Sequence, residues 1–170
     1  VLAQYVNASP EYISFRYAYA GKPELARGDE FDHGAVDGDL RFNLSHSGDV
    51  ALLAVALASD VGVDVEQLRE MNDAMGIARR YFSANEFACW EALSDAERTA
   101  GFFRCWTRKE AYLKALGDGL RAPLDAFVVT LGPDEPPRLL QCSPHDEHGR
   151  WTLADVPVGA FLSGGVDSSL

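Results

Sequence analysis

Two carboxylates alternate with valines in GVDVE, residues 62–66. Side chains two positions apart on a strand point to the same face, so Asp64 and Glu66 would stand side by side. Their like charges repel each other, and a divalent cation would offset that repulsion. Magnesium suits the pair because it is held by one or two carboxylates together with phosphates and water. A solvent-facing acidic edge or a salt bridge to an arginine is the alternative, and the pair alone favours that alternative.

A second charged group lies in WTRKEAYLK, residues 106–114. On a helix, Glu110 and Lys114 share a face, and Lys109 lies beside them. A third acid with two ammonium groups suits a metal–diphosphate site, where the acid binds metal or takes a proton and the lysines neutralise phosphate oxygens. The alternative is a helix salt bridge worth about 0.3–0.5 kcal/mol, and it is the better explanation of this stretch by itself.

Residues 42–47, FNLSHS, place hydroxyls and an imidazole near a strand end. Ser45 and His46 are adjacent and point to opposite faces of a strand, so a nucleophile–base hydrogen bond between them is not expected. Binding a phosphate suits them better, with hairpin turn chemistry as the other explanation. Lys22 and Pro23 in GKP add one cation in a stiff loop, which is typical of a surface turn.

The elements that would position these residues mix strands and helices. The alternation of apolar and polar residues predicts strands at 12–18, 40–48, 50–57, 61–68, 126–131, 137–142 and 150–153. Residues 20–25 are expected to form a loop. The segment 40–57 fits a hairpin whose second strand is buried on both faces.

Helices are expected in the middle of the chain. Residues 71–82 have helical spacing, and SANE at 83–86 is a capping-box pattern. SDAE at 94–97 repeats that pattern and opens an apolar period that ends at Gly117. Strands on both sides of a helical segment indicate the α+β class.

Composition excludes several classes of protein. The 170 residues are 47% hydrophobic and 24% charged, as in a folded globular domain. The formal net charge of −11 argues against broad nucleic-acid binding, although a phosphorylated small molecule needs only a local cluster of positive groups. No apolar run is long enough to cross a membrane. Three cysteines without a CxxC pair indicate free thiols in a reducing compartment.

Taken together, five stretches resemble the 4′-phosphopantetheinyl transferases, of the larger kind that activates peptide and polyketide synthetases. They are GKP, FNLSHS, GVDVE, RYFSANE and WTRKEAYLKALGDGL, in that family's order and close to its spacing. GVDVE followed by WTRKEAYLK is specific, whereas GKP is not. The resemblance implies Mg²⁺-dependent transfer of the phosphopantetheine arm of coenzyme A to a serine of an acyl or peptidyl carrier protein, with release of adenosine 3′,5′-bisphosphate.

The resemblance also implies the catalytic roles. Asp64, Glu66 and Glu110 would hold Mg²⁺ against the diphosphate of coenzyme A. Glu110 would also act as the base for the carrier serine. Lys114 would steady the diphosphate, with Lys109 nearby.

The nucleotide contacts implied by the resemblance come from earlier in the chain. Ser45 and His46 would contact the 3′-phosphate, and Lys22 with Pro23 would lie beside the nucleotide. The implied fold has two pseudo-symmetric α+β halves with coenzyme A between them. Residues 1–60 would form an incomplete N-terminal half and residues 61–154 the half with the metal site, in a monomeric, cytoplasmic enzyme. We expect further sequence upstream of Val1.

Residues 155–170 form an atypical tail in this interpretation. Their SGGVDSS resembles the pyrophosphate-binding loop of asparagine synthetases and related adenylating enzymes. An ATP-pyrophosphate-forming ligase fragment is therefore one alternative function. A non-catalytic remnant that binds coenzyme A or a carrier protein is another.

Overall fold

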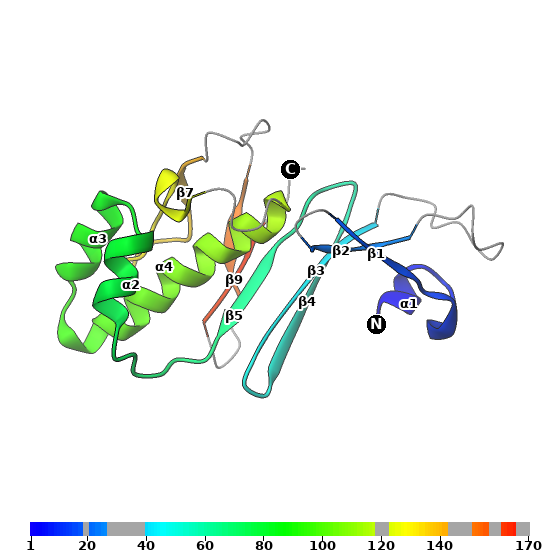
Figure 1. Ribbon diagram of the computed structural model, residues 1–170, viewed down its shortest axis with the longest axis horizontal. Helices are drawn as coiled ribbons and strands as arrows, with labels where there is room; N and C mark the ends of the chain where they lie inside the picture. Colours follow the sequence, from blue (N-terminus) through cyan, green and yellow to red (C-terminus); the bar gives the residue numbers. More distant parts are fainter. Residues whose placement is uncertain (19–20, 27–39, 118–122, 143–150, 157–160, 166–170) are drawn as a thin grey trace.

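The computed structural model describes residues 1–18, 21–26, 40–117, 123–142, 151–156 and 161–165, the last for its backbone. Helices and strands are mixed along the chain, which confirms the α+β class. The helices after residue 73 gather at one end of the molecule, a long hairpin stands in the middle, and the N-terminal segment lies at the other end (Figure 1).

The N-terminal segment contains a short helix and a small sheet. Helix α1 (Leu2–Tyr5) is followed by a 3₁₀ turn at Pro10–Tyr12. Strand β1 (Phe15–Tyr17) pairs antiparallel with β2 (Pro23–Leu25). The prediction of a loop over residues 20–25 is therefore wrong for its second half, and Gly21, with φ +86°, makes the turn.

The predicted hairpin is confirmed. Strand β3 (Leu40–Ser47) pairs antiparallel with β4 (Val50–Leu57) along its whole length, and Gly48 takes φ +56° in the connection. The expectation that β4 is buried on both faces is wrong. Ala51 and Leu57 are exposed and the other β4 residues are half-buried, because within the described residues this sheet has only two strands.

The strand that carries the acidic pair is also confirmed, in a shorter form. Strand β5 (Val63–Glu66) forms one edge of an antiparallel sheet in which β9 (Phe161–Gly165) lies between β5 and β8 (Leu153–Asp155). The first part of the SGGVDSS motif thus continues β9, and residues 166–170 lie outside the described residues.

Three helices follow β5: α2 (Ala74–Tyr81), α3 (Ala84–Glu91) and α4 (Asp95–Leu116). The capping box at α3 is confirmed, since the Ser83 hydroxyl accepts from the Glu86 amide and the Glu86 carboxylate accepts from the Ser83 amide. Ser94 sits at the N-cap of α4 but makes no capping bond with its side chain. Gly117, with φ +74°, ends α4 as predicted.

Helix α4 is the central support of the fold. Phe102, Phe103 and Tyr112 are buried in its core face, and Trp106 stacks on Phe102 with ring centroids 6.1 Å apart. Burial of apolar surface stabilises a fold by roughly 25 cal/mol per Å². The buried aromatic face is therefore the main source of stability for α4. No helix in the described part of the chain is long and apolar enough to cross a membrane.

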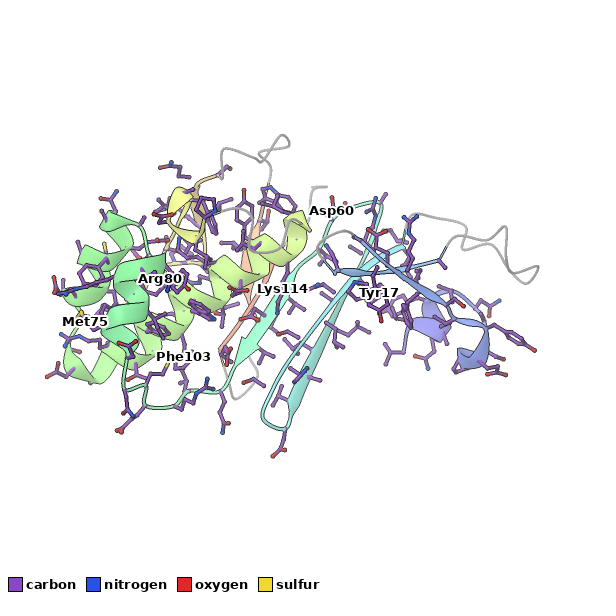
Figure 2. The ribbon with its side chains drawn as sticks, in the orientation of Figure 1. Tyr17, Asp60, Met75, Arg80, Phe103 and Lys114 are labelled. Carbon is purple, nitrogen blue, oxygen red and sulfur yellow. The ribbon has the colours of Figure 1, made fainter. Side chains whose placement is uncertain are left out.

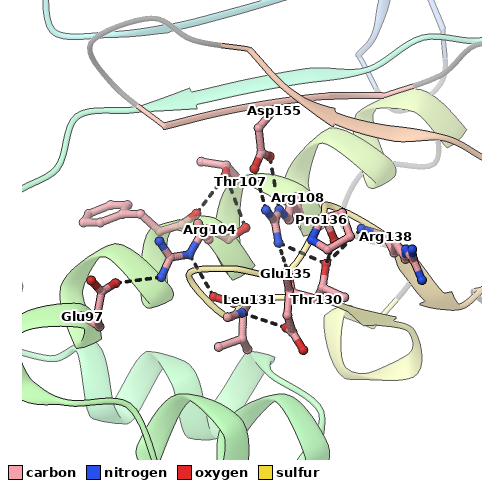
Figure 3. A network of polar contacts seen from close by, with 12 residues as sticks. Glu97, Arg104, Thr107, Arg108, Thr130, Leu131, Glu135, Pro136, Arg138 and Asp155 are labelled. Atoms are coloured by element: carbon pink, nitrogen blue, oxygen red, sulfur yellow. Dashed lines mark hydrogen bonds and ion pairs between the residues drawn. The ribbon is translucent and has the colours of Figure 1, made fainter.

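Buried arginines fasten α4 to β8 and to the connection between the short strands β6 (Val128–Val129) and β7 (Leu139–Gln141) (Figure 3). Arg104 donates to the carbonyl of Leu131 at 2.9 Å. Arg108 makes a two-pronged contact with Asp155, at 3.2 and 2.6 Å, and donates to the Thr130 carbonyl at 2.6 Å. These bonds use the geometry of guanidinium groups to fix the helix in position.

Lys109, the residue after Arg108 on α4, is buried completely and has a different set of partners. Its ammonium group donates to the carbonyls of Leu124 and Phe127 at 2.6 and 2.7 Å. It also lies 2.7 Å from the buried carboxylate of Glu86, so one residue of the capping box holds α3 and α4 together.

We expect Lys109→Met to lower the free energy of unfolding by about 3–5 kcal/mol, because it leaves the Glu86 carboxylate buried without its partner. Urea denaturation followed by circular dichroism measures this change. Arg16→Ala breaks the exposed Arg16–Glu24 pair and serves as the control, with an expected loss of at most about 1 kcal/mol. Equal urea midpoints for Lys109→Met and the wild type would contradict the structural role.

Candidate active site

The acidic strand and the charged helix face meet where α4 passes β5. Lys114 projects from α4 and its ammonium lies 2.6 Å from Oδ1 of Asp64. Figure 2 shows Lys114 in the middle of the molecule, between the helical end and the N-terminal segment. Strand β5 and helix α4 can approach closely because Gly62, just before β5, has no side chain. A Cβ at this position would overlap the Ala111 carbonyl and the Ala115 amide.

Asp64 is held by more than this ion pair. Ser45, on β3, donates to Oδ1 of Asp64 at 3.0 Å and accepts from Lys114 at 3.0 Å. The second carboxylate oxygen, Oδ2, is buried and makes no hydrogen bond within the described residues. A buried carboxylate oxygen without a donor is costly, so it is suited to binding a cation.

Burial raises the pKa of Asp64 above its usual range. Lys114 and the Ser45 hydroxyl oppose this shift by stabilising the carboxylate, and the nearby Glu66 charge adds to it. The desolvation cost of ionising Asp64 is therefore only partly offset by the groups around it.

Glu110 belongs to the same cluster. Burial raises the pKa of Glu110, and the charge of Asp64 raises it further. Lys114 opposes the shift and Glu66 adds to it. The three predicted acids are thus close enough to influence one another electrostatically, as expected for strand and helix residues that face one site.

Glu66 completes the acidic set at a more exposed position. Its Oε2 accepts from the Ser47 hydroxyl at 3.1 Å and lies 3.5 Å from Arg69. The side chain of Glu66 is 26% exposed, against 7% for Asp64. A cation held between them would thus have access to solvent on the Glu66 side.

The donor set fits a magnesium ion in its chemistry. Asp64, Glu66 and Glu110 offer carboxylate oxygens, and Oδ2 of Asp64 has no hydrogen bond. In the described part of the chain, however, no three His, Cys, Asp or Glu side chains are already grouped as metal ligands. A third carboxylate would therefore have to turn toward the other two to share one ion with them.

The residues expected at the 3′-phosphate do not act together. Ser45 is buried and bonded to Asp64 and Lys114, whereas His46 is exposed on the other face of β3. The Ser45 hydroxyl faces the acidic cluster, and its contact with the 3′-phosphate stays a prediction. Alternation along the strand separates the two side chains.

Lys22 and Pro23 also take structural positions. The Lys22 ammonium donates to the carbonyls of Val61 and Ala115, each at 3.1 Å, and so joins the N-terminal segment to β5 and α4. Burial lowers the pKa of Lys22, an effect that Asp60 opposes. Pro23 opens β2 opposite Tyr17.

Lys109 does not reach the cluster. Its ammonium is fully buried among Glu86, Leu124 and Phe127, which corrects the expectation that it lies beside a diphosphate. Lys109 and Glu110 are adjacent on α4, so they point about 100° apart. Only Lys114, one turn beyond Glu110, shares the face that meets β5.

Two polar residues that contact Glu66 were not predicted as site residues. Ser47 donates to Glu66 from β3, and Arg69 lies 3.5 Å from the same carboxylate. The alternation of Asn43, Ser45 and Ser47 along one strand was the signal, because it places three polar side chains on one face.

Comparisons with known proteins identify the family of this chain. A model of the 4′-phosphopantetheinyl transferase superfamily matches residues 60–160, which include β5 and all of α4. The chain belongs to this superfamily. The matched segment contains all three acids of the cluster and Lys114, so the cluster lies within the part of the chain that defines the family.

Several named transferases are similar to this superfamily member. HetI of Nostoc is 39% identical over 156 residues, which are 92% of this chain and 60% of HetI. A putative transferase of Synechocystis is 31% identical over 162 residues, 93% of this chain and 60% of that protein. Sfp of Bacillus subtilis is 36% identical over 96 residues, 56% of this chain and 42% of Sfp. The chain thus spans about 60% of the first two relatives.

Solved structures show a partial likeness. The holo-[acyl-carrier-protein] synthase of Thermotoga maritima has a TM-score of 0.48 and 21% identity, covering 62% of this chain and 61% of that one. The corresponding synthase of Bacillus anthracis, in complex with CoA (3′,5′-ADP), has a TM-score of 0.46 and 22% identity, covering 62% and 91%.

The raised pKa of Glu110 predicts a dependence of stability on pH. A carboxyl whose pKa is raised by folding binds its proton more tightly in the folded state, so stability falls as pH rises through the folded pKa. We expect metal-free Glu110→Gln to melt at a higher temperature than the wild type at neutral pH. The gain should shrink as pH falls from the raised folded pKa toward the ordinary glutamate pKa of about 4.3, and it should be absent below that value. Thermal melts across this pH range in a chelating buffer test it, and a gain that is constant with pH would contradict it.

Proposed function

We propose that the protein transfers the 4′-phosphopantetheine arm of coenzyme A to a serine of an acyl or peptidyl carrier protein, with Mg²⁺ as cofactor and adenosine 3′,5′-bisphosphate as by-product. The observation that carries the proposal is the meeting of Asp64 and Lys114 at 2.6 Å within a cluster that also contains Glu66 and Glu110. Membership of the superfamily and the names of the relatives support the same activity.

The chemistry of the site suits attack on phosphorus. Such a reaction needs charge neutralised on the phosphate oxygens and a hydroxyl aligned with the bond that breaks. Asp64, Glu66 and Glu110 are the residues that would hold Mg²⁺, which supplies charge neutralisation on the diphosphate when bound. Oδ2 of Asp64 supports this assignment because it is buried and none of the described residues donates a hydrogen bond to it.

Glu110 is the proposed base for the carrier serine. Burial raises the pKa of its carboxyl toward the operating pH, which favours proton transfer from the incoming hydroxyl. Its half-buried position on α4 leaves part of the side chain accessible to a partner.

Lys114 is the proposed cation for the diphosphate. Its side chain is 30% exposed, and its ammonium carries three donors, of which Asp64 and Ser45 use two. Within the described residues, a third donor remains for a phosphate oxygen.

A monomeric, cytoplasmic enzyme is part of the proposal. None of the three cysteines forms a disulfide within the described residues, and Cys105 is buried, which suits a reducing compartment. The net charge of −11 suits a small phosphorylated ligand in a local site better than a nucleic acid. His46, Lys22 and Pro23 remain the proposed residues on the nucleotide side.

We expect Asp64→Asn to abolish transfer while the chain stays folded. The loss should exceed the ~10–100-fold cost of removing an outer partner of a metal ligand. Incubation with Mg²⁺, a fluorescent coenzyme A analogue and an apo-carrier protein measures label on the carrier serine. The control is Asp60→Asn, because Asp60 is an exposed acid nearby on the chain whose pairing with Arg41 is worth little. Full transfer by folded Asp64→Asn would rule out the metal role.

We expect Lys114→Ala to lower kcat about 10²–10³-fold, as loss of a donor to a developing charge does in other enzymes. Its KM for coenzyme A should change far less, because the contact strengthens in the transition state. Steady-state kinetics and calorimetric titration with coenzyme A separate the two effects. Weakened coenzyme A binding with normal kcat at saturation would refute the assignment.

A further inference from the structure

Strand β3 contacts β5 through side chains that take the place of backbone carbonyls. Its alternate residues present oxygen atoms to the alternate amides of the β5 segment that face it. The three bonds join Asn43 to Val63 at 2.8 Å, Ser45 to Val65 at 3.3 Å and Ser47 to Gln67 at 3.1 Å. The register of β5 against the hairpin is therefore set by polar side chains.

The two serines have a second bond that Asn43 lacks. The Ser45 hydroxyl donates to Oδ1 of Asp64 at 3.0 Å, and the Ser47 hydroxyl donates to Oε2 of Glu66 at 3.1 Å. Each serine thus ties a β5 amide to the carboxylate of the residue just before that amide. The same arrangement occurs twice, two residues apart, which makes an accidental contact a poor explanation.

The bonding capacity of Ser45 is fully used. A hydroxyl has one donor and two acceptor sites, and here it accepts from Val65 and Lys114 and donates to Asp64. Its proton is therefore directed at Oδ1 of Asp64. The Lys114 ammonium also bonds to Oδ1, so Oδ2 is the oxygen left without a partner in the described residues.

We propose that Ser45 and Ser47 are positioning residues that hold Asp64 and Glu66 in the orientation that receives a divalent cation. This inference rests on the proposed function, because it concerns the cation of the same site. Hydrogen bonds to metal-binding carboxylates fix their rotamers before the ion arrives, and their loss weakens binding ~10–100-fold.

A purely structural role of the serines, in joining β3 to β5, is the competing explanation. A comparison with Asn43 distinguishes this role from the positioning of the acids. Asn43 makes the same kind of bond to a β5 amide but is not bonded to a carboxylate. Replacing Asn43 should therefore weaken the junction of β3 with β5 without disturbing either acid. Ser45→Ala and Asn43→Ala form a matched pair, since both residues are buried on the same face of the same strand.

The test uses the whole chain and Mn²⁺ alone, titrated by electron paramagnetic resonance of the free ion. We expect Ser45→Ala to raise the Kd for Mn²⁺ ~10–100-fold. Asn43→Ala should keep the wild-type Kd while lowering the melting temperature. Ser45→Thr keeps the hydroxyl and should restore binding. Ser47→Ala should weaken Mn²⁺ binding as well, and it is the variant to test if Ser45→Ala does not fold.

The outcomes separate this inference from the proposed function. Wild-type affinity for Mn²⁺ in folded Ser45→Ala and Ser47→Ala would overturn the positioning role and leave the transferase proposal standing. An equal loss of affinity in Asn43→Ala would also overturn it, because the effect would then come from the strand junction. If the wild-type chain binds no Mn²⁺, both the positioning role and the metal part of the proposed function fail.

Discussion

The close approach of β5 to the last turns of α4 is the constraint on which the rest of the site depends. Gly62, Ala111 and Ala115 keep this interface free of bulky side chains, so the backbones can come near one another. Lys22, from the N-terminal segment, donates to the carbonyl of Val61 just before β5 and to that of Ala115 on α4, and so holds the two segments together. A strand carrying two acids and a helix carrying a third, together with a lysine, can share one site only because the separation is this small.

Helix α4 divides its charged residues between two tasks. Arg108 and Lys109 lie on the side toward β6 and β8, where each has fixed partners and supports the fold. Glu110 and Lys114 lie on the side toward β5, where charges are less fully paired. The sequence predicted the helix, its end at Gly117 and the shared face of Glu110 and Lys114 from spacing alone. The sequence could not show that Lys109 has a structural role, because its partner Glu86 is recognisable only as a capping residue until the fold buries the two side chains together.

The placement of the β3 side chains was beyond sequence reasoning for a similar reason. Alternation along residues 43–47 indicates one polar face, but hairpin edges commonly face solvent, and the pattern is the same in both cases. The partner strand follows about 20 residues later and is joined through side chains, without the backbone pairing that strand signals detect. The acidic pair was easier to find, because two carboxylates alternate with valines and the charged residues of the later helix favour a shared site over a salt bridge.

Lys114 alone does not neutralise the negative charge of the acidic cluster. One ammonium bonds to Oδ1 of Asp64, while burial and the neighbouring acids still raise the pKa of Asp64 and of Glu110. Under the proposed function, protons and divalent cations would compete for the same oxygens, and each would relieve the same repulsion. A cation would do so without protonating the acids, which would leave Glu110, the proposed base, able to accept a proton. The repulsion among the three acids would thus favour a small divalent cation, with water and phosphate as its other ligands.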